Sequence, residues 1–145
     1  MLVTISAIAI LLVLSAFFSG TETALTAASQ PLMHQLGLKG NHRAQALNRM
    51  FESKERFLGA ILLGNNAVNI LGSALAAGLF ISLFGNAGVI YATLAMTLLV
   101  VVFGEIVPKT YAFKNANRAA LAVAPVIGAL VTVLAPVTHA LQIVV

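Results

Sequence analysis

Long uncharged stretches, separated by short basic segments, set the pattern of this chain. Residues 1–21, 57–104 and 119–145 carry no charged side chain. A helix needs about 20 predominantly apolar residues to cross a bilayer. The middle stretch is long enough for two crossings, and Gly85-Asn86-Ala87-Gly88 divides it, because Gly and Asn favour a tight turn. The pattern predicts membrane spans at about 1–28, 57–84 and 89–107, the last two joined as a hairpin.

The final segment, residues 117–145, is compatible with two structures. It is long enough to span, but Pro125 and Pro136 interrupt it. A proline inside a helix breaks or kinks it. The segment is therefore either a fourth span or a bent helix that lies partly in the membrane.

Residues 31–56 differ from the spans because apolar and polar side chains alternate there at roughly helical spacing. The apolar positions in and just after this segment are Leu36, Leu47, Met50, Phe51 and Phe57, and Leu38-Lys39-Gly40-Asn41 marks a break. This pattern favours short amphipathic helices at the inner headgroup layer. A plain basic cytoplasmic loop is the alternative.

Composition supports a single all-α membrane domain. Of 145 residues, 60% are hydrophobic and 8% are charged, whereas a soluble domain carries roughly a quarter charged residues. Cysteine is absent, which excludes disulfides and thiolate metal sites. His34, His42 and His139 are scattered, so we expect no zinc site. The apolar start lacks a basic n-region and a cleavage site, so we interpret it as a retained helix rather than a signal peptide.

The placement of charge predicts the orientation. All eight basic residues lie in 31–56 and 109–118, and positively charged loops stay in the cytoplasm. Both segments then share the inner side, and the N-terminus and the turn at 85–88 lie outside. Because the charge of +4 is placed this way, it indicates membrane orientation rather than nucleic-acid binding.

Glu105 is the ionisable group that ends the longest uncharged run. A charge at membrane depth costs a few kcal/mol, so such a residue is a functional candidate by default. Pro108 has no N–H to donate to the carbonyl four residues earlier, which belongs to Gly104. This short motif therefore offers two oxygen ligands where water is scarce. Lys109 either snorkels to the interface or pairs with Glu105, four residues away.

Two further helices add oxygen donors. Ser15, Ser19 and Glu22 share one helical face, and so do Asn65 and Asn69. Neutral oxygens with one carboxylate suit a hard cation such as Mg²⁺, Ca²⁺ or Na⁺. Each group also has a structural alternative, because serine often bonds its own helix, asparagine can join helices, and Glu22 can face headgroups.

Three motifs together resemble a known family. They are Ser15-x-x-Phe18-Ser19-Gly20-x-Glu22-x-Ala24, Leu63-Gly64-Asn65-x-x-x-Asn69 and Gly104-Glu105-Ile106-x-Pro108-Lys109. In order and spacing, they resemble the DUF21 transmembrane domain of the bacterial CorC and animal CNNM (cyclin M) magnesium transporters. The resemblance covers nearly the whole chain.

The resemblance implies an architecture and an ion site. Family members are homodimers with three transmembrane helices per subunit and a juxtamembrane belt helix, here 117–145, that leads to cytosolic CBS domains. The ion ligands carried over are Ser15, Ser19, Asn65, Asn69, the Gly104 carbonyl and Glu105. Asn66 lies about 100° around the helix from Asn65 and is the alternative to it. Glu22, Thr23, Pro108 and Lys109 are accessory candidates.

The expected function is that of a non-enzymatic Mg²⁺ transporter domain in the inner (plasma) membrane, crossing it several times. The resemblance implies export by alternating access, coupled to Na⁺ entry. A Mg²⁺-sensing scaffold that regulates another transporter, without flux of its own, is the alternative. An intramembrane hydrolase using Glu22 and Glu105 is disfavoured because no Ser–His pairing is present. The CBS region is absent, and the apolar end looks like that of a truncated chain, so nucleotide regulation is not assigned.

Overall fold

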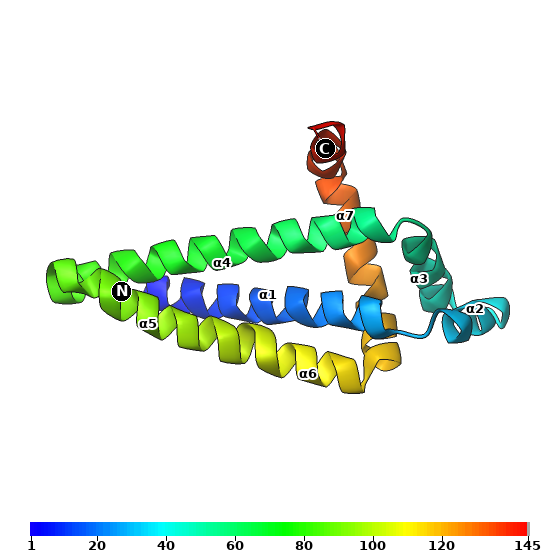
Figure 1. The fold of residues 1–145 in the computed structure, drawn as a ribbon, viewed down its shortest axis with the longest axis horizontal. Helices are drawn as coiled ribbons and strands as arrows, with labels where there is room; N and C mark the ends of the chain where they lie inside the picture. Colours follow the sequence, from blue (N-terminus) through cyan, green and yellow to red (C-terminus); the bar gives the residue numbers. More distant parts are fainter. Residues whose placement is uncertain (145) are drawn as a thin grey trace. The chain divides into compact units, whose positions relative to one another are not determined.

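Over the residues that the structure describes, the protein consists of helices joined by short turns and has no strand. The computed structural model describes the backbone of residues 1–144 and their side chains, except those of residues 131, 134, 135, 137–139, 141, 142 and 144. The elements in chain order are α1 (Leu2–Ala27), α2 (Gln30–Leu38), α3 (His42–Glu52), α4 (Lys54–Phe84), the 3₁₀ turn η1 (Gly85–Ala87), α5 (Gly88–Leu99), the π-helix η2 (Val100–Ile106), α6 (Val107–Lys114) and α7 (Ala116–Val144) (Figure 1). The predicted all-α fold class is confirmed for this part of the chain.

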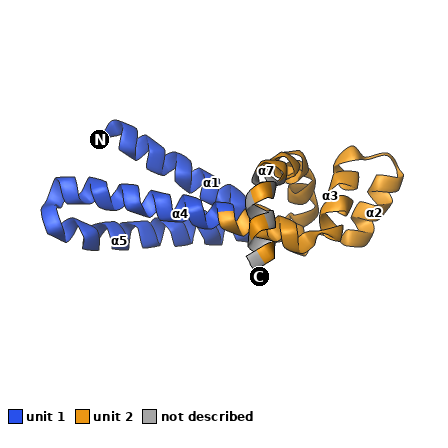
Figure 2. Cartoon of the chain, turned by 90° about the horizontal axis from the view of Figure 1, so that it is seen from above, with its two compact units in different colours: residues 1–20, 64–110 blue, residues 21–63, 111–145 orange. Residues whose placement is uncertain are grey.

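The helices form two compact units. Unit 1 comprises residues 1–20 and 64–110, and unit 2 comprises residues 21–63 and 111–145 (Figure 2). Two continuous helical stretches, Leu2–Ala27 and Lys54–Lys114, are long and apolar enough to cross a membrane. The second folds back at η1, so it provides two antiparallel arms. That three helices cross the membrane stays a prediction.

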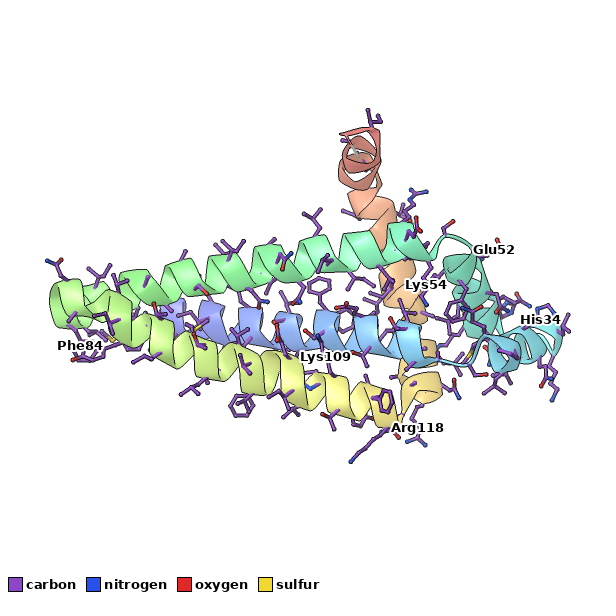
Figure 3. The ribbon with its side chains drawn as sticks, viewed as in Figure 1. His34, Glu52, Lys54, Phe84, Lys109 and Arg118 are labelled. Carbon is purple, nitrogen blue, oxygen red and sulfur yellow. The ribbon has the colours of Figure 1, made fainter. Side chains whose placement is uncertain are left out.

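A helical hairpin dominates unit 1. Its arms, α4 and α5, run side by side in opposite directions (Figures 1 and 2). Gly85 has φ +71°, a left-handed conformation that glycine adopts without steric cost. The turn therefore forms where the sequence predicted it. Three aromatic rings gather at this tip, where Phe84 stacks on Phe80 and meets Tyr91 edge-on, with ring centroids 5.8 and 5.3 Å apart (Phe84 is labelled in Figure 3).

Next to the tip, the hairpin packs against α1 through apolar side chains. Buried Ala76, Ala92 and Met96 form the centre of this apolar layer. The residues packed around them are Ile8, Leu12, Ala77, Phe80, Leu99 and Val100. Small side chains at the centre let the helices approach closely, which is how helices associate in lipid.

The second arm widens into a π-helix before Pro108. The Val107 N–H donates to the carbonyl of Val102, five residues earlier. An α-helical bond to the Gly104 carbonyl would need an N–H on Pro108, which proline lacks. A π-helical turn shifts the pairing by one residue and lets the helix continue past the proline. The helix thus runs to Lys114 as α6, beyond the predicted span end at 107.

Unit 2 contains the short helices of the basic segment. Ser29 and Asn41 accept N-terminal N–H groups of α2 and α3, and Gly40, with φ +94°, turns the chain between them. Amide side chains of α3 bind backbone carbonyls of α2: Gln45 Nε2 lies 2.9 Å from Gly37 O, and Asn48 Nδ2 lies 3.0 Å from Met33 O. The position of this pair at a headgroup layer stays a prediction.

Helix α7 completes unit 2 and packs against α3. Pro125 and Pro136 lie inside it. Its start is held by Asn117, whose Oδ1 accepts the Ser29 N–H at 2.8 Å. The structure thus has a helix here, and its role as a fourth span or a belt stays open. Among the histidines, His34 and His42 are exposed, and the side chain of His139 lies outside the described residues.

Candidate cation site

The polar pairs of α1 and α4 meet within unit 1. Ser15 Oγ donates to Asn65 Oδ1 at 3.3 Å, and Asn65 Nδ2 donates to Ser19 Oγ at 3.5 Å. Asn69 Nδ2 donates to the same Asn65 Oδ1 at 3.4 Å. The spacing of four residues places each pair on one helical face. We refer to Ser15, Ser19, Asn65 and Asn69 as the polar cluster.

The polar cluster is buried but loosely bonded. Ser15 and Ser19 are 0% exposed and Asn65 is 7% exposed. Every buried side-chain N and O among the described residues has a hydrogen-bond partner. The three distances are nonetheless long, since protein hydrogen bonds cluster at about 2.7–3.0 Å. Such bonds are individually weak, so the cluster can rearrange around a ligand at little cost.

The π-helix η2 provides a third wall. A Cβ atom placed on Gly104 would lie 2.9 Å from Ser15 Oγ, which is closer than these atoms can approach. A side chain at this position would therefore force the Ser15 hydroxyl to shift. Near Gly20, a Cβ would meet the Pro108 carbonyl oxygen at an ordinary 3.6 Å. The sequence Gly104-Glu105 thus lies against α1 at the level of Ser15.

Phe18 borders the polar cluster from α1. It is buried, and its ring lies over Gly64, where a Cβ would be 3.0 Å from Cζ. Phe17 packs edge-on against Phe18, with centroids 5.8 Å apart. The Phe18 ring therefore forms an apolar boundary next to the hydroxyl and amide groups of the polar cluster.

The remaining candidates lie outside the network. Asn66 is exposed, so Asn65 rather than Asn66 contributes to the polar cluster. Glu105 is half-buried and makes no hydrogen bond to the cluster, although its neighbour Gly104 contacts Ser15. Lys109, labelled in Figure 3, is exposed. Among the described side chains it forms no ion pair with Glu105. Glu22 and Thr23 belong to unit 2, where both are half-buried.

Comparison with known proteins identifies the family. The family model described as the cyclin M transmembrane N-terminal domain matches residues 6–145. The chain belongs to this cyclin M family. It is therefore a membrane domain in contact with the lipid bilayer.

Several curated proteins are similar to this cyclin M domain. The UPF0053 inner membrane protein YfjD of Escherichia coli is 38% identical over 99 residues, covering 68% of this chain and 23% of that protein. A UPF0053 protein of Haemophilus influenzae is 36% identical over 134 residues, 92% of this chain and 32% of that protein. A chloroplastic DUF21 domain-containing protein of Arabidopsis thaliana is 38% identical over 131 residues, 90% and 20% respectively. The chain spans a third or less of the length of these relatives.

The donor set of this cyclin M domain suits a hard cation. Hydroxyl, amide and backbone oxygens are ligands preferred by Mg²⁺, Ca²⁺ and Na⁺. Within the described part of the chain, no three His, Cys, Asp or Glu side chains gather closely enough to hold a metal. A cation at the polar cluster would therefore be held mainly by neutral oxygens.

A groove next to the cluster was not predicted. A cavity of about 360 Å³ is lined by residues of α4, α5 and the start of η2. Its polar lining residues are Asn69, Ser73, Thr93 and Thr97, and its apolar ones are Ala77, Ala92, Met96, Val100 and Val101. Two sequence signals pointed to it, because Ser73 continues the Asn65–Asn69 spacing and Thr97 follows Thr93 by four residues.

Proposed function

We propose that this cyclin M domain transports Mg²⁺ across the membrane, and that the polar cluster with Gly104 and Glu105 is its ion site. One observation carries the proposal: buried hydroxyl and amide groups of two helices bond to each other beside a glycine of a third. Burying polar groups in a membrane domain costs free energy, so such residues commonly mark substrate pathways.

The ligand set fits the coordination that Mg²⁺ requires. Mg²⁺ takes six oxygens in octahedral geometry, at about 2.0–2.1 Å. Six groups are at hand: Ser15, Ser19, Asn65, Asn69, the Gly104 carbonyl and Glu105. On ion entry the serine hydrogens turn away and the amide oxygens turn inward, which breaks only the long bonds of the cluster. One carboxylate among neutral donors binds weakly enough for release.

The direction we propose is export coupled to Na⁺ entry, in a homodimer that works by alternating access. Moving a divalent cation outward against −100 mV costs about 4.6 kcal/mol, twice the value for one charge. Inward Na⁺ supplies such energy. The name of the Escherichia coli relative as an inner membrane protein supports the same location here. We propose that the N-terminus lies outside, because the basic segments favour the cytoplasmic side. Cytosolic CBS domains are expected in the full-length protein.

The decisive experiment measures Mg²⁺ flux from liposomes that contain the purified protein. Glu105→Gln keeps the shape of the side chain but removes the charge, so both Mg²⁺ binding and flux should fall to background. Glu52→Gln, at an exposed position in α3, is the matched control and should behave as wild type. Wild-type flux in Glu105→Gln contradicts the proposed site.

Binding and flux together separate transport from sensing. Wild-type protein that binds Mg²⁺ in calorimetry but moves none, with or without a Na⁺ gradient, contradicts transport and favours the sensing scaffold. Flux that does not respond to the Na⁺ gradient removes the coupling and leaves Mg²⁺ transport in place.

A further inference from the structure

The groove between α4 and α5 carries oxygen atoms at a depth where lipid offers none. Thr93 and Thr97 on α5 and Asn69 and Ser73 on α4 supply its polar lining. The rest of the lining is apolar and includes Ala92 and Met96 of the apolar layer. Hydrocarbon chains cannot hydrogen-bond, so polar groups facing them gain no partner. The volume of about 360 Å³ is large enough for several water molecules, because each occupies about 30 Å³ in the liquid.

The two threonine hydroxyl groups of the groove can take part in further hydrogen bonds only as acceptors. Thr93 Oγ1 donates to the Val89 carbonyl at 2.8 Å, and Thr97 Oγ1 donates to the Thr93 carbonyl at 2.6 Å. Each threonine has thus used its only hydrogen, and its oxygen can still accept a bond or bind a cation. Ser73 Oγ makes no hydrogen bond to any described residue.

Asn69 connects this groove with the polar cluster. Its side chain lines the groove and donates to Asn65 Oδ1. Asn65, Asn69 and Ser73 succeed one another at four-residue intervals on one face of α4. Ser73 lies about 12 Å along the helix from Asn65, at 1.5 Å per residue, in the direction of the hairpin turn. Three polar side chains thus extend from the cluster as far as Ser73 in the direction of the turn, and Thr93 and Thr97 face the same groove from α5.

We propose that this groove is a water-filled access route that joins the polar cluster to the side of the membrane where the hairpin turn lies, and that its cargo is a hydrated hard divalent cation. The choice of cargo rests on the proposed function. Neutral acceptor oxygens stabilise the water molecules around such an ion without binding the ion tightly. Weak binding is required if the ion is to pass along the route. Asn69 is the point at which the ion exchanges these waters for ligands of the cluster.

Cysteine accessibility tests the route directly. The chain contains no cysteine, so each introduced thiol is the only one in this domain, and any cysteine elsewhere in the full-length protein is first replaced by serine. Ser73→Cys and Thr97→Cys probe the groove. Leu98→Cys and Leu94→Cys probe the lipid-facing surface. Both positions lie on α5, as Thr97 does, and are 67% and 61% exposed. The full-length protein in liposomes is treated with a membrane-impermeant, positively charged methanethiosulfonate reagent.

The route predicts that the groove cysteines react on the order of tenfold faster than the leucine controls, because the reactive thiolate forms in water and not in hydrocarbon. Mg²⁺ flux should then drop to background after labelling at Ser73→Cys and stay unchanged after labelling at Leu98→Cys. Equal reaction rates at groove and control positions overturn the proposal. A disulfide between two copies of Ser73→Cys also overturns it, because a second subunit then covers the groove.

The same data distinguish this proposal from the proposed function. Wild-type Mg²⁺ flux with an unreactive groove overturns the access route alone. A reactive groove without Mg²⁺ flux in the wild type overturns the transport function, and the cation as cargo with it.

Discussion

The apolar layer and the polar cluster are built from the same three helical segments of unit 1, yet they hold those segments together differently. In the apolar layer, Ala76, Ala92 and Met96 pack with their neighbours through van der Waals contact alone. In the polar cluster, Ser15 and Asn65 join α1 to α4 through a hydrogen bond of 3.3 Å. Lipid is as apolar as leucine, so neither region gains from excluding water.

The difference separates stability from function. Close apolar packing cannot be exchanged for another partner without leaving a void. The long hydrogen bonds of the polar cluster can be exchanged for an ion, because hydroxyl and amide groups bind both. We therefore expect substitutions in or near the apolar layer to reduce folding stability and to leave Mg²⁺ affinity unchanged. Those in the polar cluster should mainly reduce Mg²⁺ affinity and have smaller effects on stability.

The largest effect is expected for Gly88→Ala at the tip of the hairpin. A Cβ there would collide with the backbone carbonyl of Phe80, and backbone cannot move aside as a side chain can. We expect a loss of about 3 kcal/mol or more in the free energy of unfolding, measured by SDS titration of the detergent-purified protein with circular dichroism. Gly78→Ala, whose Cβ would meet nothing within 4 Å, is the control. Equal stability of the two variants contradicts the prediction.

The next largest effect tests the apolar layer through Phe80→Ala. The ring packs against the layer and stacks on Phe84, so its removal leaves a void that costs about 2 kcal/mol. Phe80 lies about 16 Å along α4 from Asn69, so Mg²⁺ affinity measured by calorimetry should not change. Ile81→Ala, at an exposed neighbour, should alter neither quantity. A weaker Mg²⁺ affinity in Phe80→Ala would show that the two regions are coupled.

Periodicity alone predicted much of what the structure brings together. A spacing of four residues was enough to pair Ser15 with Ser19 and Asn65 with Asn69. Glycine and asparagine located the turn at 85–88. These features depend on local geometry, which can be predicted from the spacing of residues in the sequence. Binding of an ion by these residues stays a prediction.

Three details depend on tertiary packing and were not predictable. Pro108 shows that one α-helical bond is missing, but not that the helix widens over Val100–Ile106 instead of breaking. Adjacent asparagines have the same chemistry, so only the register of α4 on α1 distinguishes Asn65 from Asn66. Hydroxyl groups differ likewise: Ser15 bonds to another helix, whereas Thr93 and Thr97 bond to their own.

Gly104→Ala tests the contact between the π-helix and the polar cluster. The added methyl group would stand 2.9 Å from Ser15 Oγ and push the serine away from Asn65. We expect Mg²⁺ affinity to fall about tenfold, equivalent to about 1.4 kcal/mol, with a loss of about 1 kcal/mol in stability. Gly20→Ala makes an ordinary contact of 3.6 Å with Pro108 and should retain wild-type affinity. Retained affinity in both variants removes Gly104 from the site.

The smallest effect on stability is expected for Ser15→Ala, which isolates one bond of the polar cluster. Interhelical hydrogen bonds in membranes contribute about 0.6 kcal/mol on average, and this one is long. A double-mutant cycle of Ser15→Ala with Asn65→Ala, measured by the same SDS titration, should give a coupling of about that size. Thr26→Val removes a hydroxyl that bonds only its own helix, at the Glu22 carbonyl, and should show no coupling to Asn65. If Ser15 also shows no coupling to Asn65, its hydroxyl does not join α1 to α4. That result contradicts the distinction between the polar cluster and the apolar layer.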